Sequence, residues 1–152
     1  MAKSVSMWKH EVKEKLADYV RQVNAAATLP DELRRLDLEY AGIRAANTDA
    51  TPVQGGGTVQ EDRMLNNIVR RGQTADALDM ARLGIARIES ALALLDETER
   101  HIASVMYINR QRGAVERLRE ELGLDDERSV YKRAEKVLRK LTIALYGREE
   151  KP

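Results

Sequence analysis

Five polar side chains near the C-terminal end of the chain share a helical spacing and could bind a polyanion. They are Arg128, Ser129, Lys132, Arg133 and Lys136. Arginine can donate two hydrogen bonds to a guanine edge, whereas lysine and serine bind phosphate oxygens. Residues three and four apart recur on one side of a helix. The pattern therefore predicts a helix whose N-terminal turns bind double-stranded DNA.

The segments around this helix follow the order helix, glycine turn, helix. Three helical segments are expected, at 97–109, at 114–122 and from a cap at Asp125 or Asp126 to Tyr146. Asp96 and Glu99 have the spacing of a capping box, and Gly123 can adopt the left-handed conformation that ends a helix at a tight turn. The order predicts a helix-turn-helix DNA-binding domain over 96–147, followed by a tail at 148–152.

One face of the last predicted helix is apolar and the opposite face is basic. The residues expected to face the core are Val130, Ala134, Val137, Leu138, Leu141 and Leu145. The outward face adds Arg139 and Lys140 to the five polar residues, with Glu135 as its acidic member. A terminal basic face is also a common solvated surface, so the argument depends on its combination with the glycine turn.

The first part of the chain predicts long helices and no strands. We expect helices over 4–27 and 31–46, interrupted at Leu29–Pro30, then a flexible glycine-rich loop over 47–60. Apolar residues from Met64 to Leu95, including Leu65 and Ile68, recur at spacings of three and four and predict one long helix over 61–95. The fold class is therefore all-α, with residues 1–95 forming a helical hairpin. The same apolar stripe leaves a homodimer seam as an open alternative.

The composition excludes several classes of protein. The chain has 152 residues, 34% of them charged, a formal net charge of +1 and no cysteine. It can therefore form neither disulfides nor thiolate metal sites, and His10 and His101 have no spaced partner for a metal or a catalytic dyad. The glycine run at 55–57 lacks the lysine and hydroxyl of a phosphate loop. We expect no enzymatic activity, no metal and no cofactor.

The hydropathy pattern gives an expectation for the compartment. No apolar run approaches the roughly 20 residues of a membrane-spanning helix. The first ten residues, MAKSVSMWKH, contain no apolar segment of the kind that directs secretion. We expect a cytoplasmic protein that does not enter the membrane.

Two sequence stretches resemble a known family. LDETERHIASVMYIN followed by AVERLREELGLDDERSVYKRAEKVLRKL is similar to region 4 of bacterial sigma factors. The closing run SVYKRAEKVLRKLTIALYG resembles the ends of phage-encoded late-transcription regulators of the ArpU and RinA type. The resemblance covers about the last third of the chain. It implies a phage or prophage transcription regulator that binds promoter DNA in the bacterial host, with contact to host RNA polymerase left open.

The resemblance also assigns individual positions. It implies that Arg128, Ser129, Lys132, Arg133 and Lys136 face DNA. It implies core positions for Val130, Tyr131, Leu138 and Leu141. A small terminase-like subunit of a phage packaging machine is the alternative, since such subunits are also helical and bind DNA. Those proteins usually have the DNA-binding motif before their oligomerising helices, and the reversed order here favours a regulator.

Overall fold

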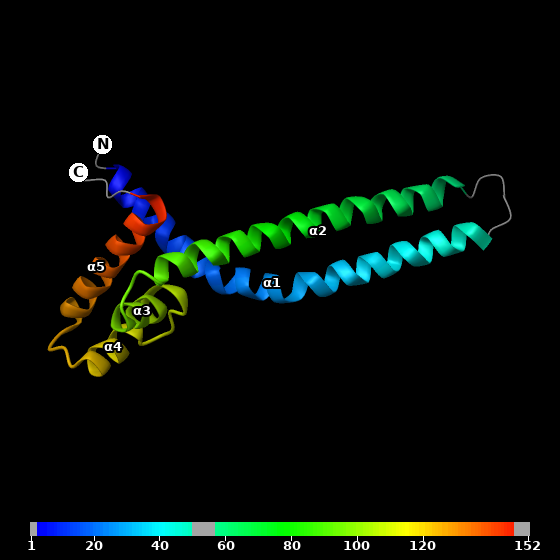
Figure 1. Ribbon diagram of the computed structural model, residues 1–152. Coiled ribbons are helices and arrows are strands. Elements are labelled where there is room, and N and C mark those ends of the chain that lie inside the picture. The colour runs from blue at the N-terminus through cyan, green and yellow to red at the C-terminus, as the bar shows by residue number, and fades with distance from the viewer. Residues whose placement is uncertain (1–2, 50–56, 148–152) are drawn as a thin grey trace. The chain divides into compact units, whose positions relative to one another are not determined.

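The chain is helical wherever its structure is described. The computed structural model describes residues 3–49 and 57–147, and within these ranges it contains helices and turns but no strand (Figure 1). The elements are α1 (Lys3–Asp49), α2 (Gly57–Leu92), α3 (Glu97–Ala103), the π-helix η1 (Ser104–Ile108), α4 (Ala114–Leu122) and α5 (Glu127–Tyr146). The expected all-α class is confirmed.

The helices group into two compact units. Unit 1 comprises Met1–Gln22 and Gly84–Pro152, and unit 2 comprises Val23–Leu83. Both long helices contribute to both units, because α1 continues through residue 22 and α2 through residue 84. This division differs from the boundary after residue 95 that the sequence suggests.

Unit 2 is a pair of antiparallel helical segments with a narrow core. Its buried hydrophobic residues are Leu36, Ile43, Leu78 and Ala81. Asn67 is buried among them at 1% exposure, and its amide Nδ2 donates a 2.9 Å hydrogen bond to the carbonyl of Leu36. The amide oxygen of Asn67 has no hydrogen-bond partner among the residues that the structure describes. A polar group therefore occupies one layer of this otherwise apolar contact.

Pro30 does not end a helix, contrary to the prediction of separate helices over 4–27 and 31–46. It lies inside the continuous helix α1. Proline removes one backbone hydrogen bond from a helix. The hydroxyl of Thr28 donates a 3.1 Å hydrogen bond to the carbonyl of Asn24 on the preceding turn. Burial of Leu36 and Ile43 beyond the proline favours continuation of the helix, because tertiary packing overrides local propensity.

The prediction of a loop over 47–60 is wrong at both of its ends. Helix α1 extends to Asp49 and α2 begins at Gly57, so both ends of the predicted loop are helical. The remaining residues, 50–56, lie outside the described residues.

Near the N-terminal end of α2, the buried residues are not the ones that the predicted apolar stripe contains. Leu65 and Ile68, expected to face inward, are exposed, and Asn67 is buried in their place. Alternating steps of three and four residues lead from Leu95 back through Ile88 and Leu78 to position 67. Within unit 2 the buried side of α2 is therefore set by Asn67, Leu78 and Ala81, and the apolar residues at 65 and 68 fall on its exposed side.

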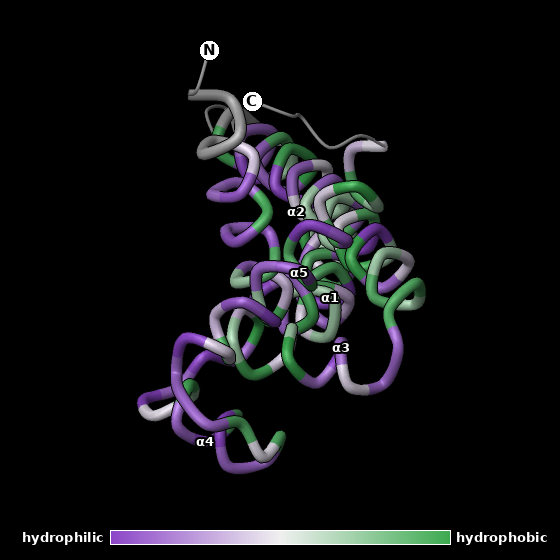
Figure 2. The backbone as a smooth tube through the Cα atoms, turned by 90° about the vertical axis from the view of Figure 1, so that its left-hand side faces the viewer, coloured by the Kyte–Doolittle hydropathy of each residue, from purple (hydrophilic) through white to green (hydrophobic). Residues whose placement is uncertain are grey.

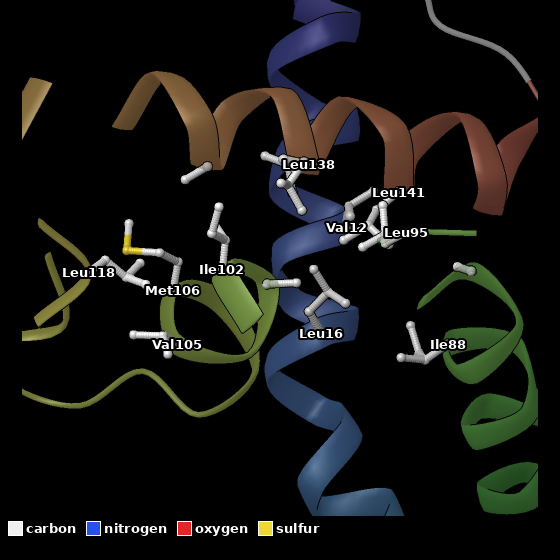
Figure 3. Close-up of a cluster of buried hydrophobic side chains, with 14 of the residues drawn as sticks. Val12, Leu16, Ile88, Leu95, Ile102, Val105, Met106, Leu118, Leu138 and Leu141 are labelled. Atoms are coloured by element: carbon white, nitrogen blue, oxygen red, sulfur yellow. The ribbon is translucent and has the colours of Figure 1, made fainter. Parts of the chain in front are cut away.

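Unit 1 contains the main hydrophobic core, to which all its helices contribute. Figure 3 shows side chains of α1, α2, α3, η1, α4 and α5 converging in one cluster. Helices α3 and α4 both contact α5. The N-terminal part of α1 adds Val12 and Leu16, each fully buried. The N-terminal segment is therefore a structural part of the same unit as α5.

Within the described ranges, no helix combines the length and apolar content that crossing a bilayer requires.

Candidate nucleic-acid interface

The turn that leads into α5 has the expected geometry. Gly123 ends α4 with φ 64°, a left-handed conformation that suits glycine because it lacks a Cβ. Asp126 then caps α5, and its carboxylate accepts a 2.8 Å hydrogen bond from the backbone N–H of Ser129. Hydrogen bonds from the hydroxyl and backbone of Ser129 hold the pKa of Asp126 below its ordinary value. The cap is therefore an ionised carboxylate at the positive end of the helix dipole.

The apolar face of α5 is buried, as predicted. The buried residues are Val130, Ala134, Val137, Leu138, Leu141, Thr142 and Leu145. The side chain of Arg87 on α2 donates a 2.8 Å hydrogen bond to the carbonyl of Leu145. These contacts fix the rotation of α5 within unit 1 and thereby determine which side chains face outward.

Four of the five predicted DNA-facing residues are exposed. Arg128, Lys132, Arg133 and Lys136 are all on the solvent side of α5. Within the described part of the chain, none of the four forms an ion pair. Their positive charges are therefore available to an anionic ligand. Ser129 is half-buried and takes part in the helix cap.

Two other charged residues of α5 form ion pairs with neighbouring helices. Lys140 forms a 2.5 Å ion pair with Glu99 of α3, which raises the pKa of Lys140. Glu135 pairs with Lys9 of α1, and the ammonium group lowers the pKa of Glu135. The four exposed cations that form no ion pair among the described residues, Arg128, Lys132, Arg133 and Lys136, thus all lie in the first half of α5.

A shallow groove runs between α5 and the start of α3. Arg133 and Lys136 line it from α5, and Asp96 and Glu99 line it from α3. The capping box predicted for these two acids is present, with a 2.8 Å hydrogen bond from the Glu99 N–H to Asp96 and a 3.2 Å bond in the reverse direction. The backbone N–H of Glu99 lowers the pKa of Asp96. Both acids are thus engaged in shaping the helix start.

Most residues of helix α4 are hydrophilic (Figure 2), and several of its charged side chains form ion pairs. Arg119 forms a 2.6 Å ion pair with Glu116. Glu121 accepts from Arg117 at 2.8 Å and lies 2.5 Å from Nε2 of His101 on α3. Glu116 and Glu121 therefore have cationic partners within unit 1, so these two acids oppose an anionic ligand less than their charge suggests.

His101 thus has a structural partner on α4. Within the described residues there is no group of three or more histidine, cysteine or acidic side chains arranged to hold a metal ion.

One position implied by the family resemblance is wrong. Tyr131, assigned to the core, is 48% exposed on α5, because the buried stripe passes through the adjacent Val130 and through Ala134. The neighbouring assignments of Val130, Leu138 and Leu141 to the core are confirmed.

The sequence reasoning missed two exposed cations and one supporting segment. Arg110 and Arg112 are exposed in the turn before α4, next to Gly113, whose φ is 81°. Their position in a turn directly before a candidate DNA-binding motif could have indicated them as candidate phosphate-binding residues. The sequence around Val12 and Leu16 did not indicate that they pack behind α5. A helical spacing of apolar residues predicts a buried face but does not show which helix packs against that face.

Comparison of the chain with protein-family models, curated proteins and solved structures finds no match.

Proposed function

We propose that the chain is a sequence-specific DNA-binding transcription regulator, and that α4, the turn at Gly123 and α5 form its helix-turn-helix. The single observation that carries the proposal is the row of exposed cations Arg128, Lys132, Arg133 and Lys136, which have no ion-pair partner among the described residues. In such motifs the second helix lies in the major groove with its N-terminal turns against base edges. These four residues occupy the first half of α5.

The two faces of α5 support this assignment. A helix that enters a groove needs a core-facing side that holds it rigidly and an outer side with long hydrogen-bond donors. The buried residues from Val130 to Leu145 provide the first, and the exposed arginines and lysines provide the second. Arg110 and Arg112, exposed in the turn before α4, add positive charge that could bind phosphates.

The family resemblance adds a biological setting to the proposal. Similarity to sigma-factor region 4 and to phage late-transcription regulators of the ArpU and RinA type favours a phage or prophage regulator acting on promoter DNA in a bacterial host. Contact with host RNA polymerase is part of the same proposal.

The test is DNA binding by the full chain, measured by fluorescence anisotropy with duplexes taken from around its own gene. The variant Arg128→Ala/Lys132→Ala/Arg133→Ala should lose most of its affinity while its melting temperature stays near that of the parent. Each phosphate contact contributes about 0.9 to the slope of log affinity against log salt. Lys136→Ala should therefore flatten that slope by about one unit on every duplex.

A matched control removes the same charge elsewhere. Arg44, Arg63 and Arg82 are exposed residues of unit 2, and replacing all three by alanine lowers the net charge by the same amount. If the exposed face of α5 is the surface that binds DNA, this control should bind DNA nearly as well as the parent. Unchanged affinity in the folded α5 triple variant, or an equal loss in both triple variants, would overturn the assignment.

A further inference from the structure

The outer side of α2 in unit 2 carries large apolar side chains that nothing in the described chain covers. Leu65, Val69, Met80 and Leu83 are 59%, 48%, 69% and 69% exposed. Steps of three and four residues connect positions 65, 69, 72, 76, 80 and 83, so these side chains share one face of the helix. We refer to the stripe from Asp62 to Leu83 as the outer α2 face. The opposite side of the helix carries the buried residues of unit 2, so the outer α2 face points to solvent.

The charged residues at the positions of this stripe are all acidic, while Arg63 and Arg82 lie at other helical positions of the same stretch. Asp62, Asp76 and Asp79 fall within the stripe, whereas Arg70 projects toward α1, where it lies 3.9 Å from Glu32. None of the three aspartates forms an ion pair within the described residues. The acids at the α1–α2 contact differ, since Glu32 and Asp37 each have arginine partners. The outer α2 face thus combines apolar anchors with uncompensated negative charge.

A second copy of the chain does not fit this face well. In a two-fold symmetric dimer a face packs against itself. An antiparallel pairing centred between Leu65 and Leu83, at position 74, would bring Asp76 within about 6 Å, measured along the helix axis, of Asp76 of the other copy. Like charges brought together in a contact that excludes water are destabilising. An anionic membrane is disfavoured for the same reason, since the aspartates would repel its headgroups.

We infer that the outer α2 face binds an amphipathic helix of another protein, one whose apolar stripe is bordered by lysine or arginine. Recognition of this kind places apolar anchors at helical spacing against an apolar surface. Leu65, Val69, Met80 and Leu83 supply that surface, and Asp62, Asp76 and Asp79 select the cationic border and the orientation. The inference is independent of DNA binding, because it concerns unit 2 and can be tested without nucleic acid.

Gly72 makes room for such a helix. It lies in the middle of the outer α2 face, and a Cβ built there would meet no atom within 4 Å. The absence of a side chain lets a second helix approach the α2 backbone closely at this point.

The experiment titrates the full chain into two fluorescently labelled synthetic helices of about 20 residues, a length that spans the face. One peptide has leucines on one side bordered by lysines, and the other has the same leucines bordered by glutamates. The lysine peptide should bind, and the glutamate peptide should bind at least about tenfold more weakly, a difference of about 1.4 kcal/mol.

Variants locate the binding site. Leu65→Ser/Val69→Ser/Leu83→Ser should weaken binding of the lysine peptide by about tenfold or more, since three apolar anchors are lost. Asp76→Asn/Asp79→Asn should weaken it and should reduce the preference over the glutamate peptide. Leu38→Ser/Leu94→Ser is the matched control, because these leucines are 68% and 74% exposed outside the face. The control should bind like the parent.

Three results would overturn the inference. The first is absence of binding by the lysine peptide. The second is binding that the outer-face variants leave unchanged. The third is self-association of the parent chain in light scattering that these same variants abolish, because a second copy would then be the occupant.

Discussion

Leu16→Ala tests whether the N-terminal segment belongs to the folded unit that contains α5. Leu16 is 0% exposed, and it belongs to the same buried cluster as Leu118, Leu138 and Leu141. Truncation of a fully buried leucine typically costs about 2–5 kcal/mol, from the lost burial and the cavity left behind. We expect a loss of about 3 kcal/mol or more, because Leu16 is completely enclosed and lies between several helices.

The single tryptophan provides the assay. Trp8 lies in unit 1, with its ring centroid 4.3 Å from that of Tyr146 in an edge-on arrangement. Its fluorescence during urea denaturation therefore reports the unfolding of unit 1. The midpoint of unfolding should move to lower urea concentration in Leu16→Ala, and the proposed DNA binding should weaken under conditions where unit 1 begins to unfold.

The control is a leucine of the same helix in the other unit. Leu38 is 68% exposed in unit 2, so Leu38→Ala should change stability by no more than about 0.5 kcal/mol. If Leu16→Ala changes the free energy of unfolding by less than about 1 kcal/mol, the N-terminal segment is not part of the core behind α5. The sequence-based domain over residues 96–147 could then fold alone.

Three further predictions follow from local geometry. Gly123→Ala should lower the free energy of unfolding of unit 1 by about 1–2 kcal/mol, because the φ of 64° at this position disfavours a residue with a Cβ. Gly72→Ala should instead raise the free energy of unfolding by about 0.5–1 kcal/mol, because the added Cβ would lie in open space within α2, and thermal unfolding of both variants tests the pair. Burial and the nearby charge of Glu135 raise the pKa of Tyr107 to about 12, so ultraviolet titration should show one tyrosine ionising late, a step that Tyr107→Phe removes and Glu135→Gln moves to lower pH. The lowered pKa of Asp96 means that its cap stabilises the fold above its ordinary pKa of about 4 and that this stabilisation is lost as pH falls through the lowered value; in Asp96→Asn the melting temperature should depend less on pH in that acidic range.

Local signals in the sequence predicted the last third of the chain well. The capping box at Asp96, the glycine turn at Gly123 and the boundaries of α4 depend on interactions within a few residues, so the sequence states them directly. The buried face of α5 was also predictable, because a short helix with one apolar side has one way to turn. Its exposed basic side follows from the same constraint.

Long-range contacts limited the rest of the prediction. Pro30 is a strong local signal for a break, yet α1 continues through it, because the partner helix stabilises both sides. Leu65 and Ile68 look like core residues in the local pattern, but the α2 residues buried in unit 2 are Asn67, Leu78 and Ala81, and Leu65 and Ile68 are exposed. The pairing of Lys9 with Glu135 joins residues far apart in sequence, and no local pattern indicates it.

The buried amide of Asn67 has a consequence for how the two long helices can move past one another. Sliding α2 along α1 by one helical turn would shift Asn67 by about 5.4 Å and remove the carbonyl of Leu36 from its reach. Leu36, Leu78 and Ala81 would tolerate such a shift far better, since apolar contacts have no fixed donor and acceptor. Asn67→Leu should therefore make the pair more tolerant of alternative alignments even where its overall stability rises. The buried amide thus favours one alignment of the two helices, together with the ion pairs of Arg71 with Asp37 and of Arg70 with Glu32.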